Sequence, residues 1–388
     1  MRLSMISAAL VAAIIGYGST IALVLAAAQA VGATAEQTTS WVAAVCFGKA
    51  IGSACLSTWS RVPIVLAWST PGAALIAATT GVDIHAAAGA FIAAGLAIAL
   101  TALIRPLARA IDAIPASLAA AMLAGVLLPF CLAIAVQTAA APALILPIVA
   151  VFLVVRLISP LYAVLAALAV GVGLAFAGGG AGPVDFSGFD PLPLTLVRPD
   201  FRLDVIVGLG LPLYLVTTAS QNLPGFAVLR ANGYEPPVRA ALLTTGLGSA
   251  AAALFGAHTF NMAAITASIC LGDDVHPDRS QRWRVGLAYG GFWMLLGFAG
   301  PLVVAVVLAM PSGIVATVAG LALTTPLMTA AAAALAEPDH RFPAVATLVV
   351  TASGIAVLGV GAAFWGLAVG LGALAMERAA RRIRQSLP

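Results

Sequence analysis

Long apolar segments separated by short polar connections fill the sequence from its first residues to its basic end. Most of these segments are long enough for one helix to cross a bilayer, which takes about 20 residues. Counting them along the chain predicts an all-α polytopic membrane protein with about 14 transmembrane segments. The last apolar region, Phe342–Met376, is too long for one helix, so we expect two short spans joined at Gly359–Gly361.

The third and tenth spans differ from the others because each is predicted to be broken. In residues 62–81, extended-type apolar residues run up to Trp68, and Ser69-Thr70-Pro71 then has the composition of a helix N-cap and first turn. In residues 257–272, polar residues precede an apolar, helix-forming run. Non-helical backbone at bilayer depth has to line a cavity or be buried in protein. We therefore expect in both spans a short extended piece and then a half-helix whose N-terminus attracts an anion.

The composition excludes a soluble protein, since 62% of the residues are hydrophobic and only 8% are charged. The apolar character continues beyond residues 1–32, so this stretch is expected to be a first span and not a cleaved signal peptide. A net charge of +4 indicates no nucleic-acid partner, because the basic residues lie at predicted helix ends. The cysteines lack metal-ligand spacing, so we expect buried thiols and no metal site. They are Cys46, Cys55, Cys131 and Cys270.

The distribution of positive charge predicts the orientation. With 14 spans and a cytoplasmic N-terminus, all but three of the 18 Lys and Arg residues fall on the cytoplasmic side. The exceptions are Arg198 and Arg202 outside, and Lys49 within the membrane. We therefore expect both termini to be cytoplasmic.

A connection rich in Gly, Pro and Asp, residues 177–202, divides the chain into two halves. Residues 1–176 hold spans 1–7, residues 203–377 hold spans 8–14, and residues 378–388 form a basic cytoplasmic tail. Seven spans is an odd number, so the second half would enter the membrane from the opposite side, as an inverted repeat. A short echo agrees with this prediction: Ile51-Gly52-Ser53-Ala54 and Leu247-Gly248-Ser249-Ala250 each precede a broken span.

Polar side chains concentrate at the end of span 8, which is expected over about residues 203–223. There Ser220, Gln221 and Asn222 precede a predicted break at Pro224-Gly225. Polar groups in hydrocarbon are expensive, which favours a site lined by these residues. The alternative is that Gln221 and Asn222 are solvated at the cytoplasmic end of the span.

Two ionisable residues are predicted inside the membrane, His258 and Lys49. A histidine titrates near neutral pH and could carry a coupled proton, or it could be a neutral group bonded between helices. Lys49 could pair with an anionic substrate, but its flexible stem favours a structural role in which it bonds backbone carbonyls or snorkels.

Several other residues are candidates for lining the site. Tyr17 lies between two glycines, a pattern that permits a close backbone approach or a break but is also common in helix packing. Trp68 and Phe260 could form aromatic walls or belong to the core. Hydrolase and phosphate-binding motifs are missing from the sequence, so we expect no enzyme.

Three strings resemble the benzoate/proton symporter family: Gln221-Asn222-Leu223-Pro224-Gly225-Phe226-Ala227-Val228-Leu229-Arg230 with Gly233-Tyr234, Trp68-Ser69-Thr70-Pro71-Gly72-Ala73-Ala74-Leu75, and Asn261-Met262-Ala263-Ala264-Ile265-Thr266-Ala267. The resemblance covers essentially the whole chain. It implies a secondary active transporter that imports benzoate with a proton across the bacterial inner membrane.

That family resembles in turn the nucleobase and sulfate transporters, which have a fold of two inverted seven-span repeats. The resemblance implies a core domain of residues 1–104 and 203–310 that moves against a gate domain of residues 112–176 and 312–377. Nucleobase carriers have glutamates in spans 8 and 10, whereas this chain has Ser220-Gln221-Asn222 and His258 there. The difference argues against a uracil or xanthine substrate.

From these observations we expect the benzoate carboxylate to lie at the two half-helix N-termini, with no cofactor, no metal, and H⁺ as the coupling ion. The expected partners are benzoate and membrane lipid, and the small residues of the gate domain would allow a homodimer. The alternatives are a carrier of another aromatic or organic anion or of a nucleobase, a passive anion channel, and, less favoured, a membrane enzyme. The expected substrate-binding residues are Tyr17, Ser69, Thr70, Gly72, Ser220, Gln221, Asn222, His258, Thr259, Phe260 and Asn261.

Overall fold

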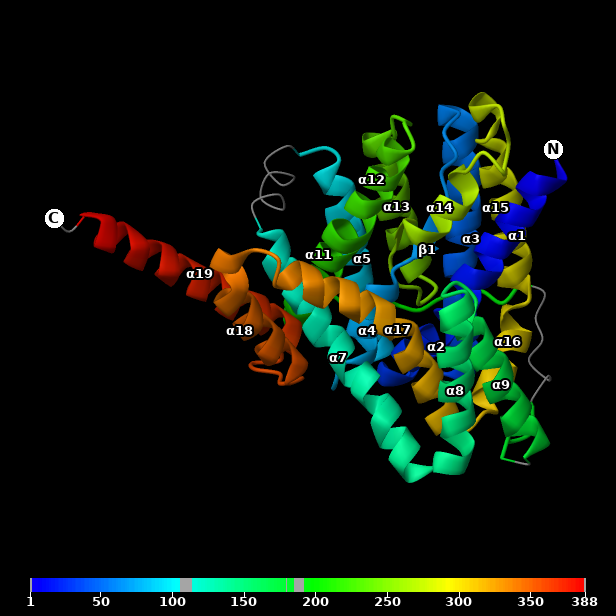
Figure 1. Cartoon of the computed structure of the whole chain (residues 1–388), viewed down its shortest axis with the longest axis horizontal. Coiled ribbons are helices and arrows are strands. Elements are labelled where there is room, and N and C mark those ends of the chain that lie inside the picture. The colour runs from blue at the N-terminus through cyan, green and yellow to red at the C-terminus, as the bar shows by residue number, and fades with distance from the viewer. Residues whose placement is uncertain (1, 105–113, 179, 185–191, 387–388) are drawn as a thin grey trace.

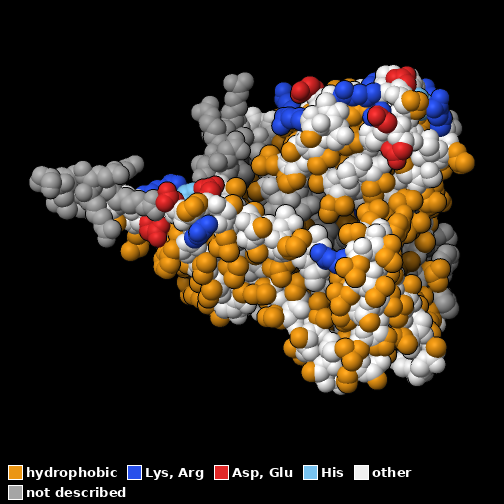
Figure 2. Space-filling model, in the orientation of Figure 1, with side chains coloured by type: hydrophobic (Ala, Val, Ile, Leu, Met, Phe, Trp, Pro, Cys, Tyr) orange, Lys and Arg blue, Asp and Glu red, His pale blue; other side chains and the backbone are white. Residues whose placement is uncertain are grey.

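A computed structural model describes residues 2–104, 114–178, 180–184 and 192–386, with side chains as far as residue 380. The chain is mostly helical (Figure 1). Apolar side chains cover the flanks, and most charged side chains in this view gather at the end that holds the N-terminus and around the projecting C-terminal helix (Figure 2). Arg105 and Arg109, which the orientation argument used, lie outside the described residues.

The helices follow the predicted apolar segments closely. Those of the first half are α1 (Leu3–Gly18), α2 (Ile21–Ala30), α3 (Ala35–Ser60), α4 (Thr70–Ala77), α5 (Ile84–Thr101), α7 (Ala116–Ala140), α8 (Pro142–Ile158) and α9 (Ala163–Ala177). Those of the second half are α10 (Leu203–Val205), η1 (Ile206–Gly210), α11 (Leu211–Thr217), η2 (Thr218–Asn222), α12 (Leu223–Ala231), α13 (Val238–Ala253), α14 (Ile265–Leu271), η3 (Arg279–Gln281), α15 (Arg284–Phe298), α16 (Gly300–Leu308), α17 (Ser312–Ala334), η4 (Pro338–His340), α18 (Arg341–Ala352) and α19 (Ala362–Ser386).

The third and tenth spans are broken, as predicted. Strand β1 (Leu66–Trp68) precedes the half-helix α4, and strand β2 (Phe260–Met262) precedes α14. The two strands pair antiparallel, with Leu66 opposite Met262 and Trp68 opposite Phe260. Pairing satisfies backbone groups that neither strand could satisfy inside its own segment, which is the requirement for non-helical backbone at this depth.

The first span is also interrupted. Helix α1 ends at Gly18 and α2 begins at Ile21, after Ser19 and Thr20. A Cβ atom at Gly18 would lie 2.1 Å from Leu165 Cδ2 on α9, so glycine allows this close approach. The pattern around Tyr17 therefore marks both a break and a packing contact.

The eighth span contains no break at Pro224-Gly225, contrary to the prediction. Residues 203–231 form one helical run that extends well beyond Leu223 and contains two π-helical turns, η1 and η2. The wider turn η2 ends at Asn222, and the helix continues through Pro224 because proline is tolerated in a helical first turn. Gly225 lies against β2, since a Cβ atom there would lie 2.5 Å from Met262 Cβ.

The end of the chain also differs in detail from the prediction. Helices α18 and α19 do follow one another through residues 353–361, but α18 has only 12 residues and α19 has 25. By length and composition, six helices in the described residues could cross a membrane, or seven with the pair α15–α16, which bends by 54°. The arrangement of 14 spans in two inverted repeats therefore stays a prediction.

The helices pack in two groups (Figure 1). In one group α15 packs on α1 and α3, and α13 packs on α3 and α5. In the other, which extends from the left to the lower part of the view, α7 packs on α17 and α18, α17 packs on α9, and α18 packs on α19. Helix α4 packs on α2, on α11 and on α7.

Candidate functional site

The paired strands are held by matching residues in the two helices that precede them. Ser53 Oγ of α3 accepts a hydrogen bond from the Leu66 N–H at 2.9 Å, and Ser249 Oγ of α13 accepts one from the Phe260 N–H at 3.0 Å. The neighbouring glycines make room for the same two strand residues. A Cβ atom at Gly52 would lie 2.6 Å from Leu66 Cδ1, and one at Gly248 would lie 2.5 Å from Phe260 Cζ. The repeated Gly-Ser pair thus performs one structural task twice.

The N-terminus of α4 is closed by hydroxyl groups. Ser69 Oγ accepts a hydrogen bond from the Gly72 N–H at 3.1 Å, as an N-cap does, and lies 3.1 Å from Thr217 Oγ1. Thr217 Oγ1 lies 2.8 Å from Thr259 Oγ1, so three hydroxyls connect α4, α11 and the residue before β2. Thr70 Oγ1 lies 3.2 Å from Thr20 Oγ1 in the break of the first span. The hydroxyl groups at the start of α4 are therefore already hydrogen-bonded within the protein and hold the surrounding segments together.

The N-terminus of α14 has no side-chain cap, and two asparagines lie beside it. Asn222 Oδ1 accepts a hydrogen bond from the Met262 N–H at 2.9 Å, and Asn261 Nδ2 donates to the Met262 carbonyl at 2.8 Å. Both side chains are fully buried, yet Asn222 Nδ2 and Asn261 Oδ1 have no partner among the described residues. One free donor and one free acceptor therefore remain next to β2.

The turn η2 decides which polar residues of span 8 are buried. Asn222 is buried, whereas Ser220 and Gln221 are half-buried on the same turn. The alternative of an interfacial, solvated position is therefore wrong for Asn222. A π-helical turn changes the direction of the residues that follow it, a feature that apolar periodicity does not reveal.

His258 is buried beside the indole of Trp41 from α3. Trp41 Nε1 donates a hydrogen bond to His258 Nδ1 at 2.8 Å. An indole N–H can only donate, so Nδ1 carries no proton and the ring is the neutral Nε2–H tautomer. Nε2 makes no hydrogen bond of good geometry within the described chain, although the Ser69 backbone is close enough to interact with the ring.

Three aromatic side chains pack on one another, and two of them lie against the Lys49 ammonium group. The ring centroids of Tyr17 and Trp68 are 5.3 Å apart, those of Trp68 and Trp293 are 5.3 Å apart, and those of Tyr17 and Trp293 are 5.8 Å apart. Lys49 Nζ lies 4.0 Å from the Trp68 centroid and 2.9 Å from that of Trp293. We call Tyr17, Trp68 and Trp293 the aromatic box. Its members come from α1, β1 and α15.

The structure brings most of the predicted residues together around the crossing strands. Tyr17, Ser69, Thr70, Asn222, His258, Thr259 and Asn261 contact one another or β1 and β2. Gly72 is a cap contact, since a Cβ atom there would lie 2.7 Å from Ser69 Oγ. The Phe260 ring packs between Gly48 of α3 and Gly248 of α13, so it belongs to the core.

Sequence reasoning missed Trp41, Thr217 and Trp293. A tryptophan in an apolar span is unremarkable, and a single threonine before a polar cluster does not stand out. Thr217 could have been included, because it belongs to the same run of polar residues as Asn222. Nothing in the sequence indicates that Trp41 meets His258, since 217 positions separate them.

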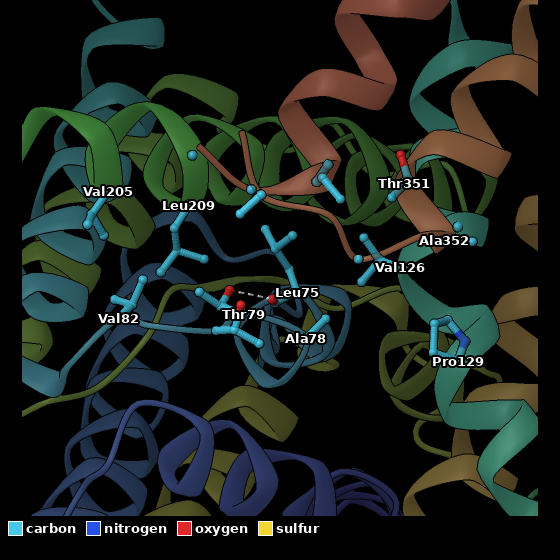
Figure 3. Close-up of a pocket in the computed structure, with 18 of the residues that line it drawn as sticks. Leu75, Ala78, Thr79, Val82, Val126, Pro129, Val205, Leu209, Thr351 and Ala352 are labelled. Carbon is cyan, nitrogen blue, oxygen red and sulfur yellow. Dashed lines mark hydrogen bonds between the residues drawn. The ribbon is translucent and has the colours of Figure 1, made fainter. Parts of the chain in front are cut away.

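A cavity of about 70 Å³ lies at the opposite, C-terminal end of α4 (Figure 3). Its walls are Leu75 and Thr79 of the α4 end, Leu209 of η1, Val126 and Pro129 of α7, and Thr351 of α18. The cavity therefore lies between the two helix groups. None of the predicted substrate-binding residues lines it.

Comparison with known proteins identifies the family. A family model described as benzoate membrane transport protein matches residues 1–376. Inner membrane protein YdcO of Escherichia coli is 38% identical over 364 residues, which cover 94% of this chain and 93% of that protein. The benzoate membrane transport protein of Acinetobacter baylyi is 33% identical over 375 residues, which cover 95% and 94%.

Among solved structures, the transmembrane domain of the cyanobacterial bicarbonate transporter BicA matches with a TM-score of 0.61 and 14% identity. The match covers 91% of this chain and 99% of that chain, and it shows a shared fold. The chain therefore belongs to the benzoate membrane transport protein family, a family of multi-pass membrane transporters.

Proposed function

We propose that this protein imports benzoate together with a proton across the bacterial inner membrane by alternating access. One observation carries the proposal. Buried polar groups in proteins normally have hydrogen-bond partners, but several around the crossing strands have none among the described residues. They include Tyr17 Oη, Lys49 Nζ, Asn222 Nδ2 and Asn261 Oδ1. A concentration of unpaired polar atoms in one place favours a ligand that completes them.

The chemistry of these groups suits a small aromatic carboxylate. Lys49, Tyr17 and Asn222 offer donors to carboxylate oxygens, and the aromatic box offers flat apolar faces to a ring. The uncapped N-terminus of α14 and the capped N-terminus of α4 add the favourable end of two helix dipoles. The name of the Acinetobacter baylyi relative supports benzoate as this carboxylate.

A coupled proton follows from the charge of the substrate. Moving an anion into a cell against the membrane potential costs about 2.3 kcal/mol per charge per 100 mV. Co-transport of one proton removes this penalty because the transported pair is neutral. The buried bases available in the site are His258 and Lys49.

The transport cycle we propose moves one helix group against the other. The group around α3, α13 and the two half-helices would form the core domain, and the group around α7 and α17 would form the gate domain, as the two-repeat fold implies. The cavity between α4 and α7 lies where such a movement would open a path. Both termini would be cytoplasmic, and the gate domains of two copies could associate as a homodimer.

Uptake into proteoliposomes tests the proposal. Radiolabelled benzoate is supplied with the external medium more acidic than the lumen, and a protonophore is added in a second arm. Protein-free liposomes run in parallel, because benzoic acid crosses bilayers unaided. We expect protein-dependent accumulation that the protonophore abolishes.

Other outcomes point to other functions. Protein-dependent flux of benzoate that carries current without proton coupling would indicate a passive anion channel. Uptake equal to that of protein-free liposomes would overturn benzoate as the substrate. A panel of other aromatic and organic anions and nucleobases would then identify the carried class.

A further inference from the structure

Lys49 is the single lysine of this sequence and lies in the middle of α3 with no exposed surface. None of the ion pairs formed by the described residues includes it, and its Nζ atom donates no hydrogen bond to a backbone or side-chain acceptor there. Snorkelling and bonding to carbonyls, the structural roles expected from sequence, are therefore both wrong. A buried ammonium group normally has a paired charge.

The aromatic box compensates only part of this burial. Cation–π contacts with Trp68 and Trp293 stabilise a desolvated cation, but they are weaker than the penalty for removing the charge from water. The Tyr17 ring contacts the same two indoles, and its hydroxyl is a second donor without a partner in the described part of the chain. The cluster therefore offers one positive charge, one hydroxyl donor and flat apolar faces, but no anion.

Among the described residues, the titratable groups around Lys49 include no carboxylate. Cys46 lies on its own helix, Tyr17 on α1 and His258 before β2, while the Tyr289 ring packs on Trp293 and interacts with Cys270. Thiols, phenols and a neutral imidazole do not supply a negative charge near neutral pH. The described residues therefore supply no counter-ion for Lys49, and a bound anion would fill this role.

His258 is a poorer proton carrier than Lys49 in this arrangement. A second proton on the imidazole would have to go to Nδ1, which already accepts the hydrogen bond from Trp41. Lys49 can gain or release a proton without breaking any hydrogen bond of the described chain. Protonation of His258 would therefore break a hydrogen bond, whereas protonation of Lys49 would not.

We propose that Lys49 binds the carboxylate of the aromatic substrate and carries the coupled proton, so that proton and carboxylate bind as one ammonium–carboxylate pair. The inference rests on the proposed function and deepens it, because it names the charged partner and the origin of the coupling. Each member of the pair raises the affinity for the other, as linkage requires. The substrate ring would lie against the aromatic box.

Benzoate binding to purified protein tests the assignment, measured between pH 6 and 9 for the wild type, Lys49→Met and Lys49→Arg. We expect Lys49→Met to bind about 100-fold more weakly, the size expected when one partner of a buried charge pair is lost. Lys49→Arg keeps a permanent charge, so it should bind with an affinity that no longer depends on pH and should not accumulate benzoate on a pH gradient. Cys55→Ala, an exposed position on α3, is the matched control and should behave as wild type.

A measurement on the unchanged protein keeps the assignment testable if a variant does not fold. Because the chain has one lysine, ¹⁵N-lysine labelling gives a single side-chain Nζ signal in NMR. We expect this signal to shift when benzoate is added and to stay unchanged with toluene, which has the ring but no carboxylate.

The outcomes separate the two proposals. Wild-type protein that neither binds nor transports benzoate overturns the proposed function, and this assignment with it. Wild-type protein that binds benzoate while Lys49→Met binds equally well, or while the Nζ signal does not move, overturns the Lys49 assignment alone. A Lys49→Arg variant whose affinity varies with pH as in wild type overturns the proton role.

Discussion

The two crossing segments share one frame but differ in chemistry. Each strand is held by a Gly-Ser pair on the preceding helix, Gly52-Ser53 for β1 and Gly248-Ser249 for β2. The half-helix α4 then begins with a closed cap, whereas α14 begins uncapped beside buried polar atoms that have no partner in the described chain. The frame is therefore repeated, whereas the asparagine groups without a partner in the described chain lie beside β2 only.

This difference indicates a division of labour. The β1–α4 side contributes a bonded scaffold and one wall of the aromatic box, Trp68. The β2–α14 side contributes Asn261 and the Met262 backbone, which also orients Asn222. Substitutions in the frame should lower stability by similar amounts in both halves. Substitutions of the asparagines beside β2 should lower benzoate uptake with little effect on stability.

The largest effect is expected from filling the glycine positions of the frame. Gly248→Val would drive a side chain into the Phe260 ring, and Gly52→Val would do the same to Leu66. Overpacking of this kind costs about 3 kcal/mol, so both variants should express poorly and unfold at clearly lower temperature in detergent. Gly291→Ala, where a Cβ atom meets no other atom within 4 Å, is the control. Stable Gly248→Val protein would show that the close packing is dispensable.

The serines of the frame should have the next largest effect. Ser53→Ala and Ser249→Ala each leave a buried strand N–H group without its acceptor, which costs about 2 kcal/mol. We expect similar decreases in the thermal unfolding midpoint for the two variants. Thr58→Ala, whose hydroxyl is exposed on α3, serves as the reference. A large decrease for one serine and none for the other would contradict the shared frame.

Asn261→Ala probes the chemical side of the comparison. It should reduce benzoate uptake about tenfold, the loss of one good hydrogen bond to substrate, without preventing membrane insertion. Initial uptake rates at equal protein density give the result. Ser268→Ala, on the exposed side of α14, is the matched control. Wild-type uptake by Asn261→Ala would remove this residue from the site.

The smallest effect concerns the cap. Ser69→Ala removes the acceptor of the Gly72 N–H group and should lower stability by about 1 kcal/mol. Ala264→Ser places a hydroxyl at the uncapped start of α14 and should change the stability by less than Ser69→Ala does. Thermal unfolding of both variants measures the difference between the two half-helices. Equal decreases would mean that the asymmetry of the caps has no energetic consequence.

Much of the frame could be predicted from local sequence. Ser69-Thr70-Pro71 marks a helix start because a cap needs only neighbouring residues, and the polar opening of residues 257–272 marks a break for the same reason. The unbroken course of span 8 through Pro224 could not be predicted, because a π-helical turn leaves the apolar pattern unchanged. The role of Lys49 was also misjudged, since a flexible side chain has several possible partners until its surroundings are known.

The sequence by itself therefore determined that the chain is a membrane protein, where most of its apolar helices lie, and that the segments at residues 62–81 and 257–272 break, because hydrophobicity and capping act over a few neighbouring residues. The tertiary structure decided which side chains meet at the break. Trp41 and His258 are 217 positions apart, and the aromatic box joins residues of α1, β1 and α15. Such contacts exist only after packing brings distant helices within a few ångströms, and that packing leaves Lys49 surrounded by rings and without an anion.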